Sequence, residues 1–462
     1  MPHLSFHGAA ETVTGSKYLL DTGTSQVLID CGLFQGLKEL RLKNWDRLPF
    51  PPASVEAVVL THAHIDHTGY LPAFVKRGFR GPVYGTGATV ELTGLLLLDS
   101  AENQEQDAQY ANREGFSKHQ PAKPLYDARD AQQAIRQLKP RNRHEWFTPA
   151  AGLRMRYHEV GHLLGAAMIE VEIDVAGRPA LRVLFSGDVG RYDAPIYHDP
   201  TPPLNCDYLI CECTYGDRDH PVVDVHDQLA EVVLASIARG GVMLVASFAV
   251  GRAQQLIYLL QQLIHRRRIP ELPIYLDSPM AIDASAIYAR HLAEHALPPG
   301  ELLAPSNALD GGNVHLTRTA EESKRINNVD GPAVIIASSG MMTGGRILHH
   351  LKRRLPDPRN TIVLGGFMAE GTRGRQLQNG AKFLRIHGQD VPVRAPVAEM
   401  SALSGHADRG ELLRWLAHLP APKKVFLTHG EKPSALVFAE RLRQEHGWDV
   451  TIPRLHETVE LG

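Results

Sequence analysis

The sequence that decides the fold is the apolar run Val55-Glu56-Ala57-Val58-Val59-Leu60, followed directly by Thr61-His62-Ala63-His64-Ile65-Asp66-His67-Thr68-Gly69. The apolar run predicts a buried strand, and the pattern becomes helical from Thr68 onward. His62 and His64 point to one side while the backbone stays extended, because side chains alternate along a strand. Asp66 and His67 face the space beyond them where the chain turns into the helix. Four ligand-type side chains within six residues can therefore serve two neighbouring metal positions.

The types of side chain in this motif indicate which metal it suits. Imidazole mixed with carboxylate, without thiolate, suits Zn²⁺ in an open catalytic site better than in a closed structural one. A lone histidine is more often a surface residue or a hydrogen-bonded core residue. Three histidines and an aspartate at this spacing favour the metal site instead.

Four residues elsewhere in the chain extend this set of possible metal ligands and supporting residues. His162 lies between glycines that allow close backbone approach, Asp188 ends a strand, and His429 follows another strand near the end of the chain. Asp30 closes a short apolar strand and is expected to hold a ligand or a bridging water from behind. His158 competes with His162, but its position inside a strand pattern makes it the weaker candidate.

Length and composition predict a globular protein of two or three domains. The chain has 462 residues, of which 43% are hydrophobic and 22% charged. Lys and Arg number 49 against 51 Asp and Glu, giving a formal net charge of −2. A polyanionic partner must therefore be held by a local basic groove. No leader sequence and no apolar run of membrane-spanning length occur, so a cytoplasmic protein without membrane association is expected.

The cysteines do not indicate a disulfide framework. The chain has 4 cysteines, three of which are Cys206, Cys211 and Cys213. Cys211 and Cys213 flank Glu212 and share the opposite face of a predicted strand. We interpret them as core residues rather than as zinc thiolates.

The order of predicted elements indicates an α/β protein with an insertion. Short strands dominate early, and a hairpin is expected from strands at Met168–Val175 and Leu181–Phe185. After the Pro-rich stretch 200–203, strands alternate with amphipathic helices, which predicts a parallel sheet. We take Tyr208–Cys213 as the first strand of this inserted unit. The expected domains are 1–205, 206–370 for the insertion, and 371–462 for the return to the first unit.

Several motifs together resemble a known family. The motif at 61–67, with Gly161-His162 and Gly187-Asp188, is similar to the metallo-β-lactamase superfamily. Downstream strings resemble its β-CASP nucleic-acid-processing branch, which includes ribonuclease J and the endonuclease of the cleavage and polyadenylation machinery. These strings are Cys211-Glu212-Cys213-Thr214-Tyr215-Gly216-Asp217-Arg218, Ser338-Ser339-Gly340-Met341-Met342, Gly344-Gly345-Arg346, Ser404-Gly405-His406-Ala407-Asp408 and Thr428-His429-Gly430-Glu431.

The resemblance covers nearly the whole chain and implies a fold. It implies an αββα sandwich with an inserted parallel-sheet β-CASP domain, and an active-site cleft between the two. The tail after Thr428 leaves no room for the extra C-terminal domain of the ribonuclease J type.

The resemblance also implies two zinc ions and a set of ligands. One zinc would bind His62, His64, His162 and Asp188. The second would bind Asp66, His67, Asp188 and His429.

The same resemblance suggests how a phosphodiester would be cleaved. A hydroxide bridging the two metals would attack phosphorus. His406 is the candidate general acid, and Glu212 would orient it and raise its pKa. Asp66 and Asp30 complete the expected catalytic set.

Polar residues in Gly-containing loops at strand ends are candidates for binding substrate, because parallel sheets bind anions there. These candidates are Arg252, Ser339, Thr372, Arg373 and Ser404. We interpret the basic runs Arg266–Arg268 and Lys352–Arg354 as solvated helix ends rather than as binding sites.

The ligand set and the resemblance together predict a di-zinc phosphodiesterase, and the resemblance alone implies that its substrate is RNA and that it is an endoribonuclease in particular. One alternative is a small-molecule esterase or thioesterase of the same superfamily. Another is a non-catalytic RNA-binding scaffold, although the ligand set is intact. RNA is the expected partner, and the resemblance also allows a homodimer and other RNA-processing proteins.

Overall fold

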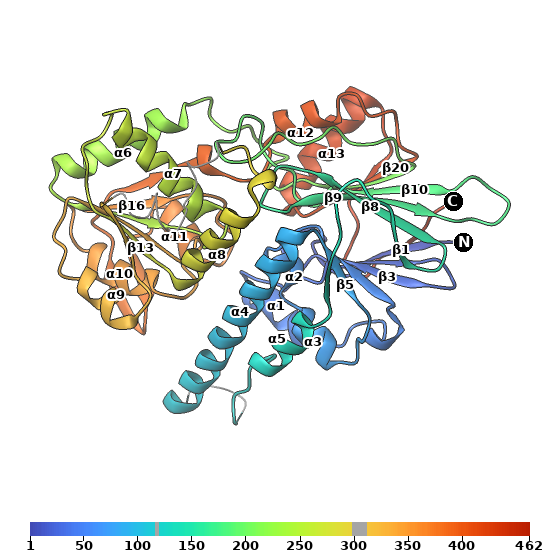
Figure 1. The fold of residues 1–462 in the computed structure, drawn as a ribbon, viewed down its shortest axis with the longest axis horizontal. Helices are drawn as coiled ribbons and strands as arrows, with labels where there is room; N and C mark the ends of the chain where they lie inside the picture. Colours follow the sequence, from blue (N-terminus) through green and yellow to red (C-terminus); the bar gives the residue numbers. More distant parts are fainter. Residues whose placement is uncertain (116–119, 298–311) are drawn as a thin grey trace. The chain divides into compact units, whose positions relative to one another are not determined.

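In the computed structural model, which describes residues 1–115, 120–297 and 312–462, the chain builds one unit, leaves it, and returns to it. The first unit comprises Met1–Ala194, His198–Asp219 and His406–Gly462, and the second comprises Pro195–Tyr197 and His220–Gly405. The second unit is thus an insertion in the first (Figure 1).

The first unit contains two mixed sheets. The first sheet runs in the spatial order β22 (Thr458–Glu460), β1 (His3–Phe6), β2 (Tyr18–Asp21), β3 (Gln26–Ile29), β4 (Ala57–Val59), β5 (Val83–Gly85), β6 (Leu138–Pro140). The second runs in the order β21 (Val450–Thr451), β20 (Lys424–Thr428), β11 (Tyr208–Glu212), β10 (Leu181–Phe185), β9 (Ala167–Ile173), β8 (Leu153–Glu159), β7 (Phe147–Ala150). The expected hairpin is confirmed, since β9 and β10 pair antiparallel.

The two sheets pack face to face through alternate apolar side chains. Phe6 of β1 contacts Phe426 of β20 with ring centroids 5.2 Å apart, and Tyr18 of β2 contacts Phe185 of β10 at 6.0 Å. The opposite face of the first sheet, including Leu28 of β3, is covered by helices. This is the layered sandwich expected from the sequence.

Helices of the first unit flank these sheets (Figure 1). They are α1 (Lys38–Leu42), α2 (Ile65–Thr68), α3 (Leu71–Lys76), α4 (Gly87–Glu114), α5 (Ala128–Ile135), α12 (Arg409–Leu416) and α13 (Lys432–His446), with short 3₁₀ turns at Lys43–Trp45 and Pro52–Ser54.

The second unit is built on a parallel sheet, as the alternation of strands and helices predicts. Its order is β14 (Val314–Leu316), β13 (Ile274–Asp277), β15 (Ala333–Ala337), β12 (Val242–Ala246), β16 (Thr361–Leu364), β19 (Val397–Glu399). A separate hairpin joins β17 (Phe383–Ile386) to β18 (Gln389–Pro392). The helices are α6 (Val225–Ala238), α7 (Arg252–His265), α8 (Pro279–Arg290), α9 (Ala320–Ile326), α10 (Ile347–Arg354) and α11 (Arg373–Gln378), with 3₁₀ turns at Leu292–Glu294 and Ser401–Leu403.

The structure corrects the expected boundaries at both ends of the insertion. β11 was expected to begin the inserted unit, but it lies in the second sheet of the first unit, between β10 and β20 and parallel to both. The chain crosses after Asp219 rather than at 205. At the other end, β19 pairs with β16, which keeps residues 371–405 in the second unit.

Within the described part of the chain, no helix combines the length and the hydropathy needed to cross a membrane. The long helix α4 is an example, because its C-terminal half is rich in Gln, Glu and Asn and is mostly exposed.

A buried lysine lies in the first unit. The Lys17 side chain donates a hydrogen bond from Nζ to the Gly15 carbonyl oxygen at 3.0 Å, and Nζ lies 4.7 and 4.9 Å from the ring centroids of Phe34 and Tyr70. Burial lowers the pKa of this ammonium to about 8, against the opposing influence of the Cys31 thiol. At neutral pH the folded protein therefore keeps Lys17 protonated, although burial disfavours its positive charge.

Lys17→Met is expected to raise the melting temperature at neutral pH. Below about pH 8 both the folded and the unfolded protein carry the proton, so the full cost of the buried charge, about 3 kcal/mol, is present. Between the folded pKa of about 8 and the ordinary value of 10.5, only the unfolded chain keeps the proton, and the stability of the wild type rises with pH. The gain from the substitution should therefore shrink across this range.

Thermal unfolding followed by circular dichroism at a series of pH values measures this effect. Lys38 provides the control, because it is exposed and Lys38→Met removes one positive charge that is already in contact with water. A gain that is absent at pH 7, or that does not change between pH 8 and 10.5, would contradict the assignment.

Candidate active site and metal centre

The motif that follows β4 builds one side of the site. The strand ends at Val59, and His64 caps α2 with extended backbone angles of φ −54° and ψ 148°. The Thr68 hydroxyl donates to the carbonyl oxygens of Ala63 and His64 at 3.0 Å each, which fixes the turn. The backbone thus changes from strand to helix inside the motif, as the sequence predicts.

The opposite side of the site comes from the ends of parallel strands. β10, β11 and β20 are adjacent and parallel, and Glu212 lies in register with Thr428. Asp188, Glu212 and His429 therefore follow or end strands at the same edge of the second sheet. This geometry brings together residues that are far apart in the sequence.

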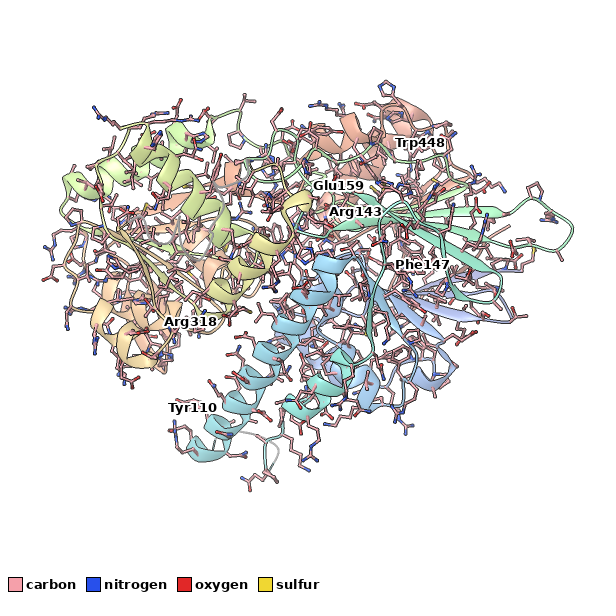
Figure 2. The ribbon with its side chains drawn as sticks, viewed as in Figure 1. Tyr110, Arg143, Phe147, Glu159, Arg318 and Trp448 are labelled. Atoms are coloured by element: carbon pink, nitrogen blue, oxygen red, sulfur yellow. The ribbon has the colours of Figure 1, made fainter. Side chains whose placement is uncertain are left out.

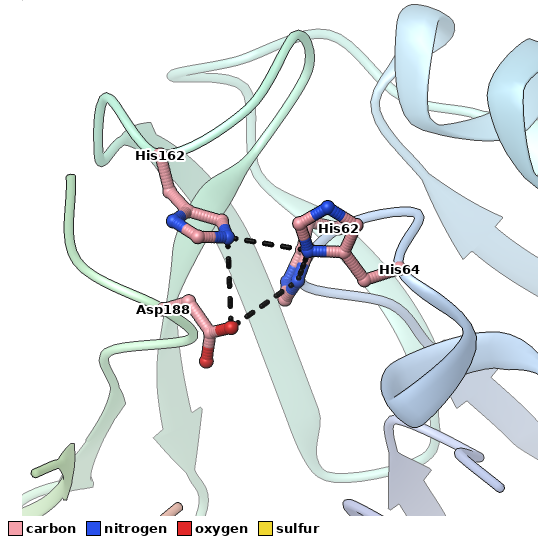
Figure 3. A group of neighbouring side chains, drawn as sticks. All are labelled: His62, His64, His162 and Asp188. Atoms are coloured by element: carbon pink, nitrogen blue, oxygen red, sulfur yellow. Dashed lines mark hydrogen bonds and ion pairs between the residues drawn. The ribbon is translucent and has the colours of Figure 1, made fainter. Parts of the chain in front are cut away.

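Figure 3 shows four side chains that point toward one another from three segments of the chain. His62 Nε2 and His162 Nε2 lie 3.1 and 3.2 Å from His64 Nδ1. The Asp188 Oδ2 atom lies 3.4 Å from His62 Nε2 and 3.6 Å from His162 Nε2. One ligand atom from each of these four residues lies within 4.8 Å of the others, so the group could hold a metal ion.

A second group lies beside the first and shares Asp188 with it. Asp188 Oδ1 lies 3.4 Å from both His67 Nε2 and His429 Nδ1, and Asp66 Oδ2 lies 3.5 Å from His429 Nε2. Ligand atoms of Asp66, His67 and His429 also lie within 4.8 Å of one another. Asp188 therefore faces both groups with different oxygens.

Two buried atoms of this site have unmet hydrogen-bonding capacity. Among the described residues, Asp188 Oδ1 and His429 Nε2 have no hydrogen-bond partner, although both side chains are nearly inaccessible to water. A buried carboxylate oxygen without a hydrogen bond is costly, and a bound cation would satisfy it. The donor set of imidazoles and carboxylates fits a divalent metal such as zinc.

The charge states of the histidines divide them into two kinds. Burial, followed by the neighbouring imidazoles, lowers the pKa of His62 far below its ordinary value, and burial lowers the pKa of His64 to about 4. These rings are neutral at pH 7, which is the form that binds metal. Burial opposes protonation of His67 as well, but the carboxylates of Asp188 and Asp30 raise its pKa to about 10. A bound cation would replace that proton.

Asp30 contacts His67 on the side of the ring away from Asp188. It is fully buried, and its Oδ2 lies 2.8 Å from His67 Nδ1. Its carboxylate also accepts hydrogen bonds from the Thr61 backbone N–H at 2.7 Å and from the Thr61 hydroxyl at 2.8 Å. These contacts direct His67 Nε2 toward Asp188.

Two threonines that the sequence did not single out also hold histidines. The Thr61 hydroxyl lies 3.0 Å from His62 Nδ1, and the Thr214 hydroxyl lies 3.1 Å from His429 Nδ1. Each threonine stands inside one of the motifs quoted above, and that position is the signal that could have found it. Each hydroxyl fixes the orientation of a ring at Nδ1, while Nε2 of His62 lies near Asp188 and Nε2 of His429 lies near Asp66.

His406 and Glu212 form a pair beside the metal groups. His406 Nδ1 lies 3.2 Å from Glu212 Oε1, and the His406 and His162 ring centroids are 4.5 Å apart. Glu212 is buried, and it accepts hydrogen bonds from the backbone N–H groups of Val189 at 2.6 Å and Thr214 at 3.2 Å. Burial disfavours the charged ring of His406, but Glu212 outweighs it and raises the pKa of His406 to about 9.

The loop that carries His162 is fixed at both ends. Arg143 lies 3.4 Å from Glu159 at the end of β8 and donates to the Ala166 carbonyl oxygen at 3.1 Å, and Figure 2 labels Arg143 and Glu159 where they meet. The Thr86 and Thr89 hydroxyls, at the start of α4, donate to the Gly165 carbonyl oxygen at 2.7 and 2.9 Å.

The competing candidates lie outside this site. His158 pairs with Glu170 of β9 at 2.9 Å instead of facing the metal groups. Cys211 and Cys213 are free, fully buried thiols, as expected for core residues. Burial raises the pKa of both thiols well above the ordinary value, which disfavours a zinc thiolate.

The five expected substrate-binding residues all lie in the second unit. Arg252 begins α7, Ser339 follows β15, and Arg373 begins α11. Thr372 is the N-cap of α11, so its hydroxyl accepts the Arg375 N–H and donates to the Ala369 carbonyl oxygen. Ser404, the fifth, is buried near the end of the second unit. Contact with a substrate stays a prediction for all five.

Comparison with known proteins gives three family matches along the chain. Residues 12–224 match the metallo-beta-lactamase superfamily, residues 253–377 the Beta-Casp domain, and residues 390–453 the Zn-dependent metallo-hydrolase RNA specificity domain.

Curated relatives match over nearly the whole chain. Ribonuclease TTHA0252 of Thermus thermophilus is 37% identical over 456 residues, which cover 98% of each protein. Transcription termination factor FttA of Methanosarcina mazei is 32% identical over 94% of this chain and 67% of its own length. A crystal structure of a protein of unknown function from Enterococcus faecalis V583 is similar in fold alone, with a TM-score of 0.55, 12% identity and 100% coverage of both chains.

Proposed function

The chain belongs to the β-CASP family of the metallo-β-lactamase superfamily, and from that premise we propose that it is a zinc-dependent ribonuclease. Its substrate in this proposal is RNA, and the bond that it hydrolyses is an internal phosphodiester. The name of the Thermus relative and the match to an RNA specificity domain support RNA as the substrate.

We assign two zinc ions to the site. One would be held by His62, His64, His162 and Asp188, and the other by Asp66, His67, Asp188 and His429. Bound there, zinc would supply an activated water as the nucleophile and would neutralise charge on the phosphate oxygens. The observation that carries this assignment is the Asp188 carboxylate, whose two oxygens face different groups of imidazoles at 3.4–3.6 Å.

The chain's own residues supply the proton for the leaving group. Glu212 accepts a hydrogen bond from the Nδ1–H of His406, so it holds the ring in one orientation and favours its charged form. We assign the other ring nitrogen, Nε2, as the donor to the departing oxygen. Asp30, which accepts a hydrogen bond from the Thr61 hydroxyl, keeps the His67 ring oriented through its contact with Nδ1.

An end-labelled single-stranded RNA tests the proposed function. Zinc-loaded protein should produce internal fragments, chelator should abolish them, and added Zn²⁺ should restore them. Release of mononucleotides from one end would overturn the endonucleolytic assignment. Hydrolysis of carboxylic esters or thioesters without any RNA cleavage would instead support the esterase alternative.

A further inference from the structure

A group of cationic and imidazole side chains, exposed except for the half-buried Arg373, gathers on the second unit. Its members, which we call the basic cluster, are His349, Lys352, Arg373 and His387. They come from α10, α11 and the turn of the β17–β18 hairpin. The chain as a whole has a net charge of −2, so a local excess of positive charge is informative.

The geometry of the basic cluster is fixed by the backbone. His349 and Lys352 are three positions apart on α10 and share one face of the helix. His387 lies in the hairpin turn with a positive φ of 47°, and its ring centroid is 4.8 Å from that of His349. Two-residue turns with positive φ are the usual connection of tight hairpins, and Gly388 supplies the second such residue.

Arg373 connects the hairpin to the loop after β15. Its Nε donates to the Arg385 carbonyl oxygen at 2.8 Å, and its Nη1 donates to the carbonyl oxygens of Met342 and Thr343 at 3.2 and 3.3 Å. These bonds hold the guanidinium in place but do not neutralise it, because all three acceptors are uncharged.

Among the described residues, no carboxylate forms an ion pair with the basic cluster. In the described ranges of the chain, neither Lys352 nor Arg373 makes an ion pair with a carboxylate, whereas Arg346, Arg359 and Arg385 each do. Asp277 is the carboxylate whose charge raises the pKa of His349, against the larger effect of burial. It is already paired with Arg346 at 2.6 Å and with His350 at 2.7 Å. An anion that reaches the basic cluster therefore meets unpaired positive charge.

We propose that the basic cluster binds a phosphate group of the RNA backbone, as a contact additional to the metal centre. This revises the interpretation of Lys352, which the sequence pattern favoured as part of a solvated helix end. This inference rests on the proposed function. A phosphate would receive charge-assisted hydrogen bonds from Lys352 and Arg373 and neutral hydrogen bonds from the two imidazoles. Because phosphates carry no sequence information, the contact would add affinity for any single strand.

Lys352→Gln and the double variant His349→Ala/His387→Ala test this proposal by RNA binding in the presence of chelator, which prevents cleavage. Each is expected to weaken binding of an oligoribonucleotide by about 3- to 10-fold, equally for strands of different sequence. Lys352→Gln should also reduce the slope of log affinity against log salt by about 0.7, the value for one phosphate contact on a single strand. Lys352→Arg should restore both quantities.

Lys423→Gln is the matched control, since it removes one positive charge from the first unit, where Lys423 is paired with Asp207 at 3.3 Å. Unfolding temperatures show whether each variant is folded. If the cluster variants bind RNA as the wild type and the control do, the additional contact is overturned while the proposed function stands. If wild-type protein neither binds nor cleaves RNA, both proposals fall.

Discussion

Asp188→Asn is expected to lose bound zinc and to reduce RNA cleavage by at least about 10⁴-fold, a loss of the size expected when the metal and its activated water are removed together. The physical reason is that this carboxylate faces both groups of ligands. Its Oδ2 lies near His62 and His162, and its Oδ1 lies near His67 and His429. An amide has one neutral oxygen in place of two charged ones, so it cannot serve both positions.

Metal analysis of the purified protein and single-turnover cleavage of labelled RNA measure the two parts of this result. Asp174→Asn is the control, because Asp174 is an exposed carboxylate in the turn between β9 and β10. Retention of two zinc ions and a near-normal rate in Asp188→Asn would contradict the shared role.

A second variant keeps the test informative if Asp188→Asn does not fold. His429→Ala removes a side chain from only one of the two groups, so it is expected to retain one zinc ion and lose the other. Loss of both ions, or of neither, would argue against two separate positions.

The part of the site inside one motif could be predicted from sequence, because local backbone geometry decides it. The four ligand-type residues lie within a strand-to-helix turn, and that turn fixes the side of the backbone from which each side chain leaves. Asp30 and Thr61 then orient the rings of two of them. Asp188 and His429 required a different argument. They converge because β10 and β20 lie on either side of β11 and run parallel to it. A local sequence pattern does not predict the order of strands in a sheet.

The misplaced boundary of the insertion has the same origin. The apolar run Tyr208–Glu212 predicts a buried parallel strand, and such a strand fits either unit. In the structure all five of its residues are buried. Its partner β20 lies beyond the whole inserted unit in sequence. The Pro-rich stretch 200–203 looked like a boundary, yet Trp415 donates a hydrogen bond to the Thr201 carbonyl oxygen and holds this stretch in the first unit.

His406→Ala is expected to retain both zinc ions and to reduce RNA cleavage by about 10³-fold, which lies within the usual contribution of a general acid. Ligand atoms of His406, Asp188 and His429 lie within 4.8 Å of one another, but neither of the two assigned sets needs His406 to complete it. Its contact with Glu212 at 3.2 Å provides the proton-bearing form. The departing sugar oxygen is a poor leaving group, so the loss of its proton donor should slow that step directly.

The leaving group separates this role from a merely structural one. A p-nitrophenyl phosphodiester expels a stable phenolate that needs no proton, so His406→Ala should cleave it at a rate close to that of the wild type. Glu212→Gln should show the same selectivity to a smaller extent. The His406 ring keeps its place in this variant, but the neighbouring carboxylate charge that raises its pKa is removed. Equal losses on RNA and on the p-nitrophenyl ester would mean that His406 shapes the metal site instead of donating a proton.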